Sequence, residues 1–129
     1  MPSTRRGFTL VELLVVILII GLIAAIAIPK WGNARERAFM AAMRSDLRSV
    51  ALHQESYLYN NRVYTPDLNA LGAVGLQTSD GVTITVNEAT TTGWSGTAMH
   101  TGTPVRCYLF VGNAAPVGSA TTEGQVDCS

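Results

Sequence analysis

The sequence has few charged residues and no excess of either sign. Charged side chains make up 14% of its 129 residues, against 47% hydrophobic ones, and the formal net charge is zero. A chain of this length forms one modest domain. Without a basic excess, nothing in the composition indicates direct binding to nucleic acid.

Patterns that support catalysis or metal binding are also absent from the sequence. It has two histidines, His53 and His100, and neither has a neighbouring cysteine or acidic residue at metal-ligand spacing. It lacks G-x-S-x-G, Walker, H-E-x-x-H, G-x-G-x-x-G and Cys-x-x-Cys motifs. An enzyme is therefore the least favoured class, and we expect no metal and no cofactor.

What the sequence does contain is one long apolar run near its start. The 21 residues of the range 8–28 would form about 31 Å of helix, which matches a hydrocarbon core of about 30 Å. Arg5 and Arg6 precede the run. The positive-inside rule then predicts that residues 1–7 stay in the cytoplasm and that the remainder is exported. We expect residues 8–29 to be a transmembrane helix.

Glu12 is an unusual residue within this run. An ionised carboxylate in hydrocarbon costs a few kcal/mol unless it is paired, and the range 8–29 contains no basic residue. Cutting the Gly7–Phe8 bond would create a partner, since an α-amino group is largely protonated at neutral pH. Phe8 and Glu12 are four residues apart, on one face of a helix. The amine could therefore meet its own Glu12 or that of a neighbouring chain.

The segment Gly7-Phe8-Thr9-Leu10-Val11-Glu12, with the basic leader before it and the apolar run to Pro29, resembles the class III signal of type IV prepilins. The resemblance implies that a membrane aspartyl prepilin peptidase cuts after Gly7 and N-methylates Phe8. It also implies that Glu12 pairs with the Phe8 amine of an adjacent subunit in a helical homopolymer. Further implied partners are an inner-membrane assembly platform, minor pilins and, before assembly, membrane lipid.

Two simpler interpretations of the start of the chain compete with this one. An ordinary secretory signal would use Ala25-Ile26-Ala27 as its cleavage site, but the apolar run is longer than the usual 7–15 residues. A secreted binding module released in this way would begin near Ile28. A plain membrane anchor explains the length of the run but neither Glu12 nor the Gly7–Phe8 pair.

Gly21 and Pro29 bracket the second half of the expected span. Glycine weakens a helix interior by about 1 kcal/mol, and proline removes a backbone hydrogen bond. A mild kink is the simpler expectation. The resemblance to pilins implies instead that the stretch between these two residues loses helicity in a filament.

The residues after Pro29 continue as an amphipathic helix. An apolar stripe with steps of three and four residues predicts that the helix extends to about Tyr59, with a disturbance near Pro29 and Gly32 and a stop at Asn60-Asn61. The stripe consists of Phe39, Met43, Leu47, Val50 and Leu58, with Ala51 and Gln54 on the same side. This apolar face must pack against another part of the chain, and a small sheet later in the sequence is the obvious candidate.

The remaining sequence predicts that sheet. Alternation in the range 82–86 and the run 105–111 are the strongest strand signals, 94–100 is a poorer one, and 124–128 could form a closing edge strand. A short helical turn over 67–71, ended by Gly72, is expected before them. The predicted fold is α+β, with a long N-terminal helix packed on three or four antiparallel strands, as in pilins. Residues 30–129 would form the exported part.

The two cysteines, Cys107 and Cys128, both fall in the last quarter of the chain. Export to an oxidising compartment favours a disulfide between them, which would restrict the unfolded chain by about 3 kcal/mol. Two free buried thiols are the alternative.

Charge is distributed unevenly over the exported part. The range 30–62 holds six bases and three acids, whereas 63–129 holds one base and five acids. Two solvated surfaces explain this pattern most simply, and attraction between a basic stem and acidic parts of neighbouring subunits is the sharper hypothesis.

The sequence therefore predicts a pilus subunit that is an inner-membrane precursor before assembly and part of a surface filament afterwards. Roles in adhesion, twitching motility and DNA uptake are equally compatible with it. The alternative within the same family is a pseudopilin of a type II secretion system. Major pseudopilins carry an acidic calcium loop near the C-terminus, and here only Glu123 and Asp127 are available for one.

Overall fold

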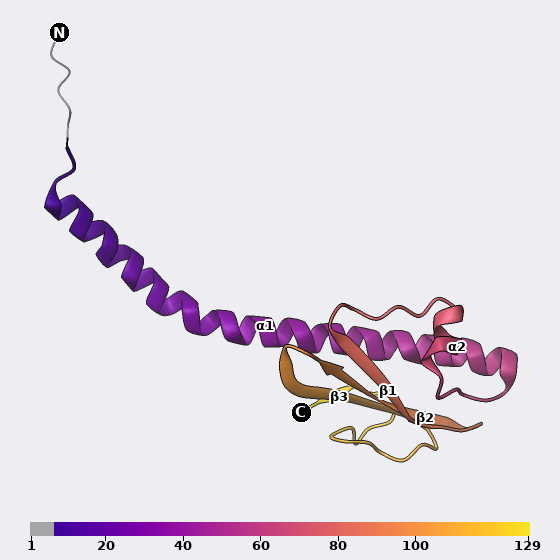
Figure 1. The fold of residues 1–129 in the computed structure, drawn as a ribbon. Coiled ribbons are helices and arrows are strands. Elements are labelled where there is room, and N and C mark those ends of the chain that lie inside the picture. Colours follow the sequence, from indigo (N-terminus) through magenta and orange to yellow (C-terminus); the bar gives the residue numbers. More distant parts are fainter. Residues whose placement is uncertain (1–6) are drawn as a thin grey trace, which may run out of the picture. The chain divides into compact units, whose positions relative to one another are not determined.

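The computed structural model describes residues 7–129, so the expected leader residues Arg5 and Arg6 lie outside the described part of the chain. The elements follow in the order α1, α2, β1, β2, β3, β4 (Figure 1). The chain divides into two compact units, one ending at Arg35 and the other comprising Glu36–Ser129. We refer to Glu36–Ser129 as the C-terminal unit.

Helix α1 (Leu10–Asn61) is 52 residues long and confirms the predicted long helix. It is the one helix within residues 7–129 that is long and apolar enough to cross a membrane. The helix continues through Pro29 and Gly32, both of which are helical, so the disturbance expected there does not interrupt it.

The end of α1 differs in detail from the expectation. The predicted stop at Asn60-Asn61 is correct, but the residue in the left-handed conformation is Arg62, with φ 62°. The Arg62 backbone N–H donates to the Leu58 carbonyl at 2.8 Å. Asn61 stays helical, and its side-chain amide donates to the Tyr57 carbonyl at 3.1 Å. Asn61 therefore caps a carbonyl with its side chain rather than through a left-handed backbone.

One face of α1 forms a wall of the core in the C-terminal unit. Met43, Leu47, Val50 and Gln54 have no exposed surface, as the apolar stripe predicts. The stripe is only half-buried at Phe39 and Leu58. The core also contains Tyr64, Leu71, Val82, Ile84, Trp94, Ala98, Cys107 and Leu109.

Two polar side chains of α1 are buried in this wall and fasten loops to the helix. Asp46 accepts hydrogen bonds from the Ser79 backbone N–H at 2.7 Å and from its hydroxyl at 2.9 Å. The Gln54 amide donates to the Thr65 carbonyl at 2.6 Å and accepts from the Thr65 N–H at 3.0 Å. The loop after α1 and the loop before the sheet are therefore each held by one buried side chain.

Helix α2 (Leu68–Ala73) lies between those two loops. Asp67 is its N-cap, and its carboxylate accepts from the Asn69 N–H at 2.9 Å. The expected helical turn is present, but it continues through Gly72 and ends at Ala73, so Gly72 does not end the helix.

The four strands form one antiparallel sheet, as predicted, and their order is β1-β2-β3-β4. They are β1 (Val82–Ala89), β2 (Gly93–His100), β3 (Thr103–Gly112) and β4 (Asp127–Cys128). The poorest strand prediction, β2, is an inner strand of this sheet. Its pattern does not alternate because both of its faces are covered: Trp94 and Ala98 are buried on one side, and Ser95 and Thr97 on the other.

The C-terminal segment closes the sheet. The edge strand is shorter than the expected range 124–128, and β4 pairs Cys128 with Cys107 and Asp127 with Tyr108. Cys107 and Cys128 form a disulfide, as predicted. The loop between β3 and β4 packs Ala114 and Ala120 against Phe110 of β3.

Candidate functional site

The start of α1 carries the residues that the sequence singled out. Gly7, Phe8 and Thr9 are not helical, and the helix begins at Leu10. The Phe8 side chain is 83% exposed. The Gly7–Phe8 bond therefore lies in a non-helical, exposed segment, which is the form of backbone that proteases cut.

Thr9 and Glu12 cap the helix reciprocally. The Thr9 hydroxyl accepts from the Glu12 backbone N–H at 3.2 Å, and Glu12 Oε2 accepts from the Thr9 N–H at 2.9 Å. The Thr9 hydroxyl also donates to Glu12 Oε2 at 2.9 Å. This arrangement is a capping box, with threonine at the N-cap and glutamate three residues later. Thr9 was not among the predicted site residues, although the pattern Thr-x-x-Glu before an apolar run was the signal for it.

The capping box places Phe8 outside the helix of the uncut chain, and the pairing expected of its amine after cleavage stays a prediction. Because Thr9 caps the helix and Leu10 is its first residue, Phe8 lies before the helix in the uncut chain. Phe8 and Glu12 therefore do not share a helix face as an i, i+4 pair. The partner that α1 gives to the Glu12 carboxylate is Thr9.

One oxygen of the Glu12 carboxylate accepts no hydrogen bond within residues 7–129. All bonds from Thr9 go to Oε2. Within residues 7–129, Oε1 has no hydrogen-bond partner and no basic side chain forms an ion pair with Glu12. A carboxylate has room for about four hydrogen bonds, so Oε1 is free to accept a cation from outside this stretch of chain.

The apolar side chains from Leu10 to Ile28 are left largely uncovered by residues 7–129. The large ones between Leu10 and Ile28 are 47% to 78% exposed, and Gly21 has open space where a Cβ would be. A continuous exposed apolar surface of this kind requires lipid or other protein around it. Gly21 and Pro29 are both helical here. The expected loss of helicity between them concerns a filament and stays a prediction.

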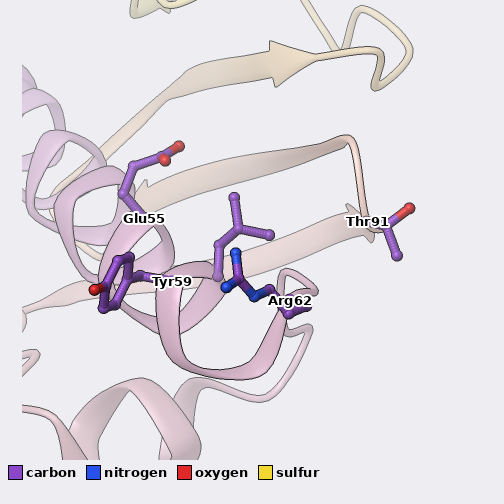
Figure 2. A pocket seen from close by; sticks show the side chains of 5 residues that line it. Glu55, Tyr59, Arg62 and Thr91 are labelled. Carbon is purple, nitrogen blue, oxygen red and sulfur yellow. The ribbon is translucent and has the colours of Figure 1, made fainter.

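The C-terminal unit has a shallow hollow of about 410 Å³ near the end of α1. Figure 2 shows Tyr59 and Arg62 from the end of the helix and Thr91 from the turn between β1 and β2. Glu55 also lines the hollow, and it accepts a hydrogen bond from the Tyr64 hydroxyl at 2.7 Å. Burial, with Glu55 beside it, raises the pKa of Tyr64 to about 12. Within residues 7–129, no hydrogen bond joins Glu55 to the hydroxyl of Tyr59 or Thr91, and we assign no reaction to the hollow.

The two acidic residues that could serve a calcium loop each accept one backbone hydrogen bond. Glu123 accepts from the Gly112 N–H at 2.7 Å, and Asp127 accepts from the Cys128 N–H at 2.9 Å. Within the part of the chain that the structure describes, no three His, Cys, Asp or Glu side chains are grouped so that they could hold a metal ion.

Comparison with known proteins gives matches to type IV pilins and to a core protein of type II secretion systems. The family model of the prokaryotic N-terminal methylation motif matches residues 2–28. The chain is 38% identical over 98 residues to the type IV wide pilus major component of Thermus thermophilus, covering 75% of each protein. It is 36% identical to the type IV major pilin of Myxococcus xanthus, over 53% of this chain and 31% of that one. It is 29% identical to the type II secretion system core protein G of Pseudomonas aeruginosa, over 54% of this chain and 49% of that one.

Proposed function

Because the chain belongs to the type IV pilin family, we propose that it is the subunit of a type IV pilus, cut after Gly7 and N-methylated at Phe8. The observation that carries this proposal is the state of Glu12. Its carboxylate is held at the start of an apolar helix by Thr9, and Oε1 has no partner within residues 7–129. The helix therefore presents an acceptor for a cation that the apolar segment does not contain.

Cleavage after Gly7 would supply that cation as the α-amine of Phe8. The capping box keeps Glu12 Oε2 occupied and its side chain fixed, so a neighbouring amine would approach Oε1. An ion pair in an apolar surrounding gains from the low dielectric and loses much if either partner is missing. Pairing between adjacent subunits would therefore set the position of each arriving helix along the filament.

The exposed apolar half of α1 supports the same proposal. Residues 8–29 would lie in the membrane before assembly and pack against other helices afterwards, because both surroundings cover apolar side chains. The C-terminal unit would face outward, on the exported side. The prepilin peptidase and an inner-membrane assembly platform would act on the membrane-bound precursor, and minor pilins would share the filament.

A pseudopilin of a type II secretion system is the second candidate, supported by the similarity to core protein G. Two observations favour a pilus. The match to the wide pilus component covers a larger share of both proteins. In addition, Glu123 and Asp127 are too few to close the six- to eight-oxygen shell of calcium without many backbone or water ligands, and within residues 7–129 they belong to no group of three His, Cys, Asp or Glu side chains that could hold a metal ion.

The substitution Glu12→Gln tests the pairing. Glutamine keeps an oxygen that can accept from Thr9, so the cap is retained, but it removes the charge that would attract the Phe8 amine. We expect membrane insertion and cleavage to continue and filaments to be lost or strongly reduced in electron micrographs of sheared cell surfaces. Glu55→Gln, in the C-terminal unit, is the matched control and should leave filaments unchanged. Normal filaments from the Glu12→Gln subunit would contradict the pairing.

A further inference from the structure

The two sulfurs of the Cys107–Cys128 disulfide lie in different surroundings. Cys107 on β3 has no exposed surface and belongs to the core. Cys128 on the edge strand β4 is only half-buried. Of the two cysteines, only Cys128 therefore has surface that an external thiol or disulfide can approach.

A cation lies directly beside the accessible sulfur. Arg44 of helix α1 places its guanidinium Nε 3.3 Å from Cys128 Sγ and donates to it. A neighbouring guanidinium favours the thiolate over the thiol and so makes a cysteine more reactive. Within residues 7–129, the structure gives Cys107 no hydrogen bond to a basic side chain.

The other charged groups around Cys128 are few. Asp127 precedes it on β4, and its carboxylate, which accepts from the Cys128 N–H at 2.9 Å, opposes a thiolate. Arg106 on β3 is exposed and adds positive charge at the same edge of the sheet. Arg44 is the one of these three groups whose side chain donates a hydrogen bond to the sulfur.

We propose that Cys128 is the site at which this chain exchanges with external disulfides and thiols, and that Arg44 is a positioning residue that holds it as the reactive thiolate. The partner is a disulfide-bearing oxidant on the exported side of the membrane. This inference goes beyond the proposed function and does not depend on filament formation.

Oxidation would proceed in two steps through Cys128. The Cys128 thiolate attacks one sulfur of the oxidant's disulfide, a mixed disulfide forms, and the first oxidant thiolate leaves. Cys107 then gives up its proton and its sulfur attacks Cys128 Sγ, which expels the second oxidant thiolate. Two protein thiols become one disulfide, and the oxidant's disulfide becomes two thiols.

The backbone holds the two cysteines in place for the second step. The Arg106 N–H donates to the Ser129 carbonyl at 3.0 Å, and the Ser129 N–H donates to the Arg106 carbonyl at 3.0 Å. These two backbone hydrogen bonds join β4 to β3 in addition to the disulfide. Cys128 would therefore lie opposite Cys107 and beside Arg44 before the covalent bond forms.

Single-cysteine variants of the full chain in detergent micelles test the assignment, with Ellman's reagent as the disulfide probe. In Cys107→Ala, Cys128 should react at least about tenfold faster than Cys107 does in Cys128→Ala, because thiolate character and access control the rate. If the guanidinium stabilises the thiolate about tenfold, Arg44→Gln should slow the reaction of Cys128 about threefold near neutral pH. The loss is smaller than tenfold because the more basic thiolate that remains is also more nucleophilic. It should also raise the apparent pKa of the Cys128 thiol.

Two control variants separate charge from structure. Arg44→Lys should keep most of the rate, and Arg48→Gln, which removes an exposed arginine one turn further along α1, should have no effect. Equal rates for Cys107 and Cys128, or equal effects of Arg44→Gln and Arg48→Gln, would overturn the proposal.

A second measurement uses the wild-type chain, so its result does not depend on whether the variants fold. The reduced wild-type chain is mixed with glutathione disulfide, quenched with acid and analysed by mass spectrometry. The mixed disulfide should be found on Cys128, and glutathione found mainly on Cys107 would refute the assignment.

Discussion

Replacing Gln54 with leucine should lower the free energy of unfolding of the C-terminal unit far more than its position on a helix indicates. Gln54 has no exposed surface, and its amide makes both hydrogen bonds to the backbone of Thr65, which is itself only 6% exposed. Leucine fills a similar volume but leaves a buried N–H and a buried carbonyl without partners. Each such group costs about 1–3 kcal/mol. Some water entry reduces the sum, so we expect a loss of about 3 kcal/mol from a total stability of about 5–15 kcal/mol.

Urea unfolding of the full chain in detergent, followed by tryptophan fluorescence, measures this loss. The two tryptophans are Trp31, which is 70% exposed, and Trp94, which is buried in the core. A Trp31→Phe background therefore leaves Trp94 as the reporter of the C-terminal unit. Ser56→Ala, at an exposed position on the same helix, is the control and should change stability by less than about 0.5 kcal/mol. A loss below about 1 kcal/mol for Gln54→Leu would show that the Thr65 backbone finds other partners and would refute this reasoning.

Three further predictions concern the C-terminal unit. Replacing Cys107 and Cys128 together with serine should cost about 3 kcal/mol in the same urea assay, and equal midpoints with and without the disulfide would contradict this. The pKa of Tyr64 is raised from 10.0 to about 12, so the folded state holds this proton more tightly than the unfolded state. Its contribution to stability is therefore present below about pH 10 and is lost as the pH rises toward about 12, and Tyr64→Phe should reduce that loss in pH-dependent unfolding curves. Gly112→Ala should lower the urea midpoint, because φ there is 66° and a Cβ would clash with the Thr92 carbonyl oxygen; an unchanged midpoint would count against this conformation of the turn after β3.

The elements that could be predicted from the sequence are those with a strong periodic pattern. The apolar run and the stripe with steps of three and four residues identified α1 and its buried face, because packing of that face repeats every turn. Alternation identified β1. The strand β2 was a poorer prediction, because a strand covered on both faces does not alternate, and Ser95 and Thr97 are as buried as their neighbours.

The details that could not be predicted depend on polar groups with distant partners. Asp46 and Gln54 resemble surface residues of a helix, and their roles appear only when Ser79 and Thr65 are brought to them by the fold. At the candidate site, the Gly7–Phe8 bond and Glu12 were recognisable from the sequence. The Thr9 cap was not predicted, because the prediction at this position rested only on the charge of Glu12. The cap follows from a different requirement, since the first N–H groups of every helix lack partners within the helix.

The measurement that tests the central claim most directly is the mass of the N-terminal peptide of the subunit in purified surface filaments. The proposed processing predicts a chain that begins at Phe8 and is heavier by one methyl group on its amine. A subunit that begins at any other residue, or that keeps residues 1–7, would leave Glu12 Oε1 without the proposed cation and would contradict the central claim.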